Sequence, residues 1–210
     1  LNLGGQITVT ALQPGITYED TDPISPAMFA IGIGEDVTNG VTVSGAIRTI
    51  HAPYGILVSP TLAGANPSDI VFGPDPTSGF GFTSSGSVLV SSLRAGFLTT
   101  ALRFEGANIS GTDYTATVQG GVSLGGIVSA SAIEADTTAV SVGAGAILNR
   151  IVTGAAITAA AAIETNDDDT DNDGPYVATA IQIDAGGSLE QIENTGTILA
   201  ASSGELGSAY

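Results

Sequence analysis

Residues 179–200 read TAIQIDAGGSLEQIENTGTILA, and residues 138–159 read TAVSVGAGAILNRIVTGAAITA. The two segments align without a gap at an offset of 41 positions. Matching positions are apolar or small and most differing positions are polar, which is typical of a structural unit stacked on its own copy rather than of an active site. The matched pairs are Ala139 with Ala180, Val140 with Ile181, Val142 with Ile183, Leu148 with Leu189, Ile151 with Ile192 and Ile157 with Ile198.

The same pattern extends upstream. Residues 100–104 (TALRF) match 138–142, and residues 127–134 (IVSASAIE) match 157–164 (ITAAAAIE) and, more loosely, 198–205 (ILAASSGE). The alanines of 155–164 alone would favour a helix. We predict strand and turn instead, because the counterparts of this segment hold Val, Ser and Gly and one fold must serve all copies.

The first 99 residues contain short alternating strands and tight-turn signals but no clean repeat. We interpret residues 1–99 as irregular N-terminal coils, or a cap, of one β-solenoid. Residues 100–210 are then regular β-helix repeats, with extra residues around 110–117 and an acidic loop insertion at 165–176.

A unit of about 40 residues has too few apolar side chains to form its own core, so the units must stack. We expect an all-β parallel β-helix, in which Ile181 lies above Val140 and Leu102 lies below it. If each unit makes two turns of about 20 residues, the chain forms about ten coils and a rod of the order of 50 Å.

The charge of the chain limits its partners. The formal net charge is −17, from 21 acidic residues against four arginines, and lysine is absent. Nucleic acids and anionic membrane surfaces would be repelled, whereas divalent cations would be attracted. Without cysteine the chain forms no disulfides. No apolar run reaches transmembrane length, so we expect no direct membrane insertion in this segment.

One acidic loop has the pattern of a calcium site. Residues 169–174 read DTDNDG, in which Asp169, Asp171 and Asp173 alternate before a glycine that permits a sharp turn. The twelfth position of the loop is Ala180 instead of glutamate, so this is not an EF-hand. Two interpretations stay open: a Ca²⁺ site completed by Glu164, Asp167 or backbone carbonyls, and a solvated corner loop. The acidic group Glu19, Asp20 and Asp22 lacks the glycine, and we interpret it as solvated.

Evidence for catalysis is weak. His51 is the only histidine, and no serine lies in a G-x-S-x-G elbow, so we interpret His51 as a hydrogen-bonded corner residue near Tyr54. Polysaccharide lyases and hydrolases on β-helices need clustered acids, often beside a basic residue. Arg150 is the only arginine of the clean repeats near the acidic loop in sequence, and its counterpart is Gln191.

The repeats at 138–159 and 179–200 resemble those in passenger regions of bacterial autotransporter-like surface proteins, over roughly residues 100–210. That resemblance implies a right-handed parallel β-helix at the cell surface or outside the cell. Because the sequence starts at Leu1 without a methionine or a basic, apolar leader, we expect that any signal peptide has been removed or that the chain is cut from a longer protein. We therefore expect a non-catalytic structural rod for surface display, adhesion or self-assembly into a filament or surface layer. The alternative is a β-helix enzyme that acts on a polysaccharide. Expected partners are further copies, head-to-tail or lateral, or other surface components. The sequence stops where a further unit would begin, so we expect either a segment of a longer array or an end that meets another subunit.

Overall fold

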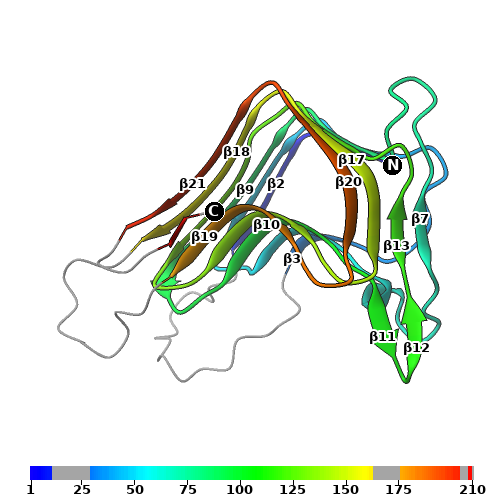
Figure 1. The fold of residues 1–210 in the computed structure, drawn as a ribbon, viewed down its shortest axis with the longest axis horizontal. Helices are drawn as coiled ribbons and strands as arrows, with labels where there is room; N and C mark the ends of the chain where they lie inside the picture. The colour runs from blue at the N-terminus through cyan, green and yellow to red at the C-terminus, as the bar shows by residue number, and fades with distance from the viewer. Residues whose placement is uncertain (11–28, 163–175, 204–207, 210) are drawn as a thin grey trace.

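The computed structural model describes residues 1–10, 29–162, 176–203, 208 and 209, and every structural statement below refers to these residues. This part of the chain is an all-β protein built from three parallel sheets, A, B and C (Figure 1). A 3₁₀ helix, η1 (Pro60–Ala63), follows one strand of sheet C.

The strands fall into the three sheets as follows, for the described ranges. Sheet A contains β1 (Asn2–Leu3), β4 (Val41–Val43), β7 (Ile70–Phe72), β8 (Phe82–Ser84), β13 (Ala116–Val118), β14 (Val122–Leu124), β17 (Ala146–Thr153) and β20 (Ser188–Asn194). Sheet B contains β2 (Gln6–Thr10), β5 (Ala46–Ile50), β9 (Ser87–Ala95), β15 (Val128–Ile133), β18 (Ala156–Ala162) and β21 (Thr197–Ser202). Sheet C contains β3 (Phe29–Ile33), β6 (Tyr54–Val58), β10 (Thr99–Phe104), β16 (Thr137–Val142), β19 (Val177–Ile183) and β22 (Ser208–Ala209).

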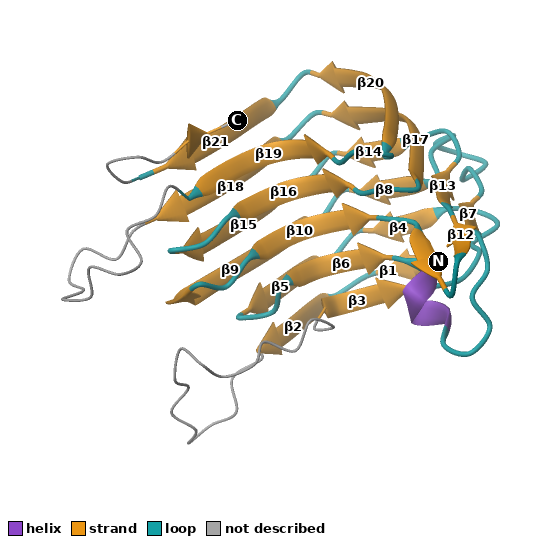
Figure 2. Ribbon diagram, turned by 60° about the horizontal axis from the view of Figure 1, so that its bottom comes forward, coloured by secondary structure: helices purple, strands orange, loops and turns teal. Residues whose placement is uncertain are grey.

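The chain visits these sheets in a fixed order, C to A to B, and then returns to C. Thus β16, β17 and β18 form one turn, and β19, β20 and β21 form the turn that lies on it (Figure 2). All pairs within the three sheets are parallel, so each turn extends the hydrogen-bonded ladders of the previous one. This arrangement is consistent with a β-solenoid.

The register predicted from the 41-residue offset is confirmed. Thr138 pairs with Thr179 and Val140 with Ile181 in sheet C, and Ile157 pairs with Ile198 in sheet B. Leu102 pairs with Val140 on the preceding side, as expected. The alanine-rich segment is the strand β18, as predicted, and not a helix.

Two expectations about the repeat are wrong. A unit makes one turn and not two, because one turn needs a strand in each of three sheets and takes 41 residues from Thr138 to Thr179. Sheet B holds six stacked strands in the described ranges, so the stack extends about 25 Å rather than 50 Å.

The alignment of 127–134 with 157–164 is also shifted by one residue, since Val128 pairs with Ile157. Val128 is fully buried and Ile127 is 49% exposed, and a slip of one position exchanges the two faces of a strand.

The described part of the first hundred residues lies in the same stack as the rest. Their strands β1 to β9 belong to the same three sheets, and β10 begins at Thr99 and pairs with β6 on one side and β16 on the other. The extra residues expected around 110–117 include an antiparallel hairpin, β11 (Ala107–Ile109) and β12 (Thr112–Tyr114), between sheets C and A.

The three sheets surround a common interior (Figure 1). The buried apolar side chains of their strands form one hydrophobic core cluster. Phe82 of sheet A and Phe104 of sheet C meet edge to face, with ring centroids 5.5 Å apart. Inward positions of successive coils stack directly, such as Leu102 on Val140, and both are fully buried. Stacked aliphatic side chains and shared strand ladders therefore stabilise a chain that has few aromatic residues.

Candidate functional site

The predicted calcium ligands lie outside the described residues. Asp169, Asp171 and Asp173 belong to residues 163–175, as do the proposed supporting residues Glu164 and Asp167. The second acidic group, Glu19, Asp20 and Asp22, also lies outside the described ranges. Within the ranges that are described, no group of three or more His, Asp or Glu side chains is placed to hold a metal ion.

His51 occupies a corner between β5 and β6, with a left-handed backbone at φ 60°. Its Nδ1 lies 3.4 Å from the Oγ of Ser92. His51 is 7% exposed and Ser92 is 2% exposed, so the serine hydroxyl is closed to a substrate. The interpretation of His51 as a hydrogen-bonded corner residue is confirmed, and this pair is not an open nucleophile site.

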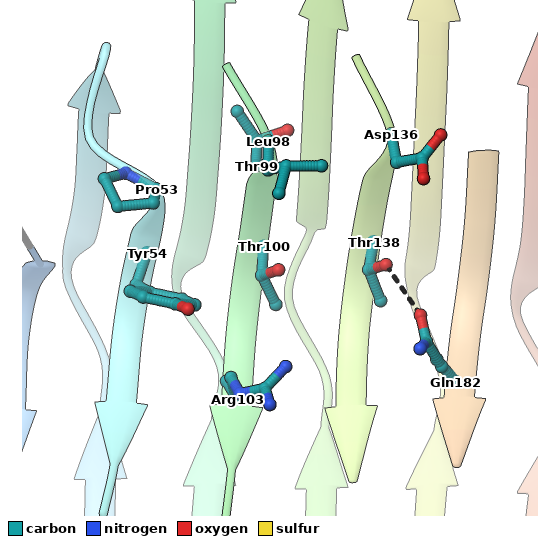
Figure 3. Close-up of a pocket in the computed structure, with 9 residues that line it drawn as sticks. All are labelled: Pro53, Tyr54, Leu98, Thr99, Thr100, Arg103, Asp136, Thr138 and Gln182. Carbon is teal, nitrogen blue, oxygen red and sulfur yellow. Dashed lines mark hydrogen bonds between the residues drawn. The ribbon is translucent and has the colours of Figure 1, made fainter. Parts of the chain in front are cut away.

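A groove of about 370 Å³ crosses the outer face of sheet C (Figure 3). We call it the sheet C groove. Neighbouring strands supply its walls, so it runs across the strands and along the stack. Its lining residues are Pro53 and Tyr54 from β6 and its approach, Leu98, Thr99, Thr100 and Arg103 from β10 and its approach, Asp136 and Thr138 from β16 and its approach, and Gln182 from β19.

A polar network holds the floor of this groove in place. The Arg103 Nε donates to Glu105 Oε2 at 2.5 Å, its Nη1 donates to Ser141 Oγ at 3.3 Å, and its Nη2 lies 3.6 Å from Asp184 Oδ2. Gln182 Nε2 donates to the other oxygen of Asp184 at 2.7 Å, and Thr138 Oγ1 donates to Gln182 Oε1 at 3.1 Å. Chains of such bonds give each side chain one preferred orientation.

The charge of Arg103 is balanced within the network. Partial burial acts to lower the pKa of Arg103, but the hydrogen bond and charge of Glu105, with smaller contributions from Tyr54 and Asp184, raise it above its ordinary value. Arg103 is therefore a fixed cation whose charge is neutralised by two carboxylates. It is a poor site for a further anion.

The second notable surface is the side of the coil β19–β21 that faces away from β16–β18, which we call the terminal face. Ile183, Ile192 and Ile198 occupy inward positions of β19, β20 and β21 and are 49%, 45% and 38% exposed. Their partners one coil earlier, Val142, Ile151 and Ile157, are fully buried. The exposure arises because no coil covers these side chains in the described part of the chain, apart from the short pairing of β22 with β19.

Comparison of the chain with protein-family models, with curated proteins and with solved structures finds no match. None of the helices in the described ranges has the length and apolar character needed to cross a membrane.

Reasoning from the sequence missed the sheet C groove. Arg150, the arginine that the sequence places near the acidic loop, does not line this groove. It donates from Nε to Gly120 O at 3.2 Å and lies over the ring of Phe80. The arginine that lines the groove is Arg103, which pairs in register with Ser141. A signal was present: Thr100 and Thr138 occupy matched outward positions of the repeat, and a row of hydroxyls on one face indicates a polar surface.

Proposed function

We propose that this protein is a non-catalytic structural rod, a right-handed parallel β-helix of the autotransporter-like passenger type that works at the cell surface or outside the cell. Its proposed work is display, adhesion and end-to-end self-assembly. The exposure of Ile183, Ile192 and Ile198 on the terminal face carries this proposal, because aliphatic side chains at core positions favour burial by another coil.

The occupant that best fits the terminal face is a second copy of the chain. The first coil offers strands of the same three sheets in the same order, β1 in A, β2 in B and β3 in C. One side of each of these strands is unpaired within the described ranges, as are the outer edges of β20 and β21. A head-to-tail contact would continue the parallel ladders, and such a contact does not close on itself.

The right-handed sense of the coil is part of the proposal. Each connection from a strand to its parallel neighbour in the same sheet crosses over through two other sheets, and crossovers between parallel strands are almost always right-handed. The resemblance of residues 138–159 and 179–200 to autotransporter-like repeats supports the same hand and a location outside the cell.

Self-assembly can be tested by sedimentation velocity over a range of protein concentrations. We expect the average mass to rise with concentration and end-to-end fibres to form at the highest concentrations. Ile192→Asp should weaken association at least tenfold, because an unpaired carboxylate would be buried in the contact. Ile147→Asp is the matched control, since Ile147 is 42% exposed on the outer side of sheet A.

A wild-type chain that stays monomeric at every concentration would overturn self-assembly. Equal loss of association in Ile192→Asp and Ile147→Asp would show that contact occurs through the sides of the rod and not through its end. Circular dichroism of each variant establishes that the strands are intact before the comparison is made.

A further inference from the structure

The outer face of sheet C carries one continuous row of side chains across its strands. Tyr54 pairs with Thr100, Thr100 with Thr138 and Thr138 with Thr179. Because all four positions are in register, one aromatic ring and three hydroxyls follow each other at the strand spacing of about 4.8 Å. A ligand lying along this row would meet an aromatic ring at one end and then hydroxyl groups at regular intervals.

The sheet C groove combines apolar and hydrogen-bonding groups. The side chain of Tyr54 extends from β6 toward β10, and Pro53 lies beside it (Figure 3). Leu98 is 60% exposed at the rim, although it is a large aliphatic residue. Thr100, Thr138 and Gln182 present hydroxyl and amide groups to the same space. This mixture suits a ligand whose rings have an apolar face and a rim of hydroxyls.

The charges of the groove exclude one large class of ligand. Arg103 is already paired with Glu105 and Asp184, and Asp136 lies at the groove wall. The chain as a whole has a formal net charge of −17. A polyanion would therefore be repelled by the protein and would find no free cation in the groove.

From these observations we infer that the sheet C groove is a binding site for a neutral oligosaccharide, whose chain lies across β6, β10, β16 and β19 along the axis of the stack. The ring of Tyr54 packs against one sugar face. The hydroxyls of Thr100 and Thr138 and the amide of Gln182 contact sugar hydroxyls. The bonds from Thr138 to Gln182 and from Gln182 to Asp184 hold the amide in one orientation before the ligand arrives.

The groove binds its ligand without cleaving it. Glycoside hydrolysis needs one carboxylic acid and one free carboxylate on either side of the scissile bond. Glu105 and Asp184 are paired with Arg103, and Asp136 is the one carboxylate among the residues that line the groove, where its Oδ1 accepts a hydrogen bond from the backbone N of Val177 at 2.8 Å. The groove therefore offers no pair of free carboxyl groups. The bound sugar therefore has an adhesive role, which is separate from self-assembly through the terminal face.

Isothermal titration calorimetry with cellohexaose, mannohexaose and maltohexaose tests this inference, with hexagalacturonate as the charged comparison. At least one neutral hexasaccharide should bind. Tyr54→Ala should weaken that binding about tenfold through lost stacking. Thr138→Val keeps the shape of the side chain but removes its hydroxyl, and should weaken binding roughly 2- to 10-fold.

Tyr114→Ala is the matched control, because Tyr114 lies on β12 of the hairpin and does not line the sheet C groove. Its binding should equal that of the wild type. The inference is overturned if no neutral hexasaccharide binds, if hexagalacturonate binds more tightly than all three, or if Tyr54→Ala and Thr138→Val bind as well as Tyr114→Ala.

Discussion

A column of glycines at the corner between sheets A and B sets how closely the coils approach. A Cβ atom added to Gly45 would lie 1.8 Å from the carbonyl oxygen of Gly5, and one on Gly86 would lie 1.9 Å from that of Gly45. The same holds for Gly126 above Gly86, at 1.7 Å. Gly45, Gly86 and Gly126 are needed because the backbone of the preceding coil fills the space of a side chain, and not because of a positive φ.

The adjacent residues Gly125 and Gly126 provide a test of this close approach. Gly126→Ala should lower the free energy of unfolding by roughly 1–3 kcal/mol or more, because backbone must move to admit the methyl group. The neighbouring Gly125→Ala should have little effect, since its Cβ would meet Ser84 O at an ordinary 3.7 Å. Urea denaturation of both variants provides the measurement. Similar stabilities for the two would contradict the close approach of coils at this corner.

At the scale of strands, the repeat of 41 residues predicted the pairing of β16 with β19, β17 with β20 and β18 with β21. The prediction succeeded because the segments that connect the strands are nearly equal in length in the two turns, outside the acidic insertion. Where the turn is shorter, as in the 29 positions from Val128 to Ile157, the offset changes and the alignment slipped by one residue. Most positions of β15 and β18 are alanine or serine. Inward and outward positions therefore differ little in polarity, and the sequence alone does not reveal the shift of one residue.

The coils before Thr100 were not predicted individually, because their turns also differ in length. The turn from Tyr54 to Thr100 takes 46 positions, whereas the turn from Phe29 to Tyr54 takes 25, so no single period describes them. The glycine two positions before an inward Ile or Val would have located each coil, as in Gly45 before Ile47 and Gly86 before Val88.

The sheet C groove could not be predicted from neighbouring residues. Tyr54, Thr100 and Thr138 are far apart in the sequence and meet only because three coils are in register. The ion pair of Arg103 with Asp184 reaches across β16 to a residue of the last described coil. Such a site depends on knowing the length of every turn between its members.

Equivalent residues of β18 and β21 test whether the terminal face is uncovered. Ile157→Ala should cost about 2–5 kcal/mol, because Ile157 is fully buried between two coils. Ile198→Ala removes the same atoms at the paired position but should cost less than about half as much, since Ile198 is 38% exposed. Thermal unfolding at low protein concentration compares them.

If a second copy covers the terminal face at high concentration, the cost of Ile198→Ala should rise with concentration while that of Ile157→Ala stays constant. Equal costs in a dilute, monomeric sample would contradict the exposure of this face.

At the scale of the whole molecule, charge opposes the association that we propose through the terminal face. A formal net charge of −17 produces repulsion between copies, which salt screens. Self-association should therefore strengthen when NaCl is raised from about 10 mM, where the Debye length is about 30 Å, to about 100 mM, where it is about 10 Å. Sedimentation measures the change. Ile192→Asp should remain monomeric at both salt concentrations, and weaker association of the wild type in the higher salt would contradict this balance of forces.

Substitutions in the acidic sequence DTDNDG can distinguish specific calcium binding from general screening of the negative charge. If Asp169, Asp171 and Asp173 bind Ca²⁺, millimolar CaCl₂ should raise the melting temperature above that in NaCl of equal ionic strength, because a ligand bound only by the folded state stabilises that state. Replacing these three residues by Asn should abolish the rise and the heat of binding in calorimetry.

The matched control changes Glu19, Asp20 and Asp22 to Gln, Asn and Asn, which removes the same charge from a group that lacks the glycine, and should keep both signals. Equal loss in the two triple variants would mean that calcium acts only as a counterion to the excess negative charge, and no heat with the wild type would exclude the site.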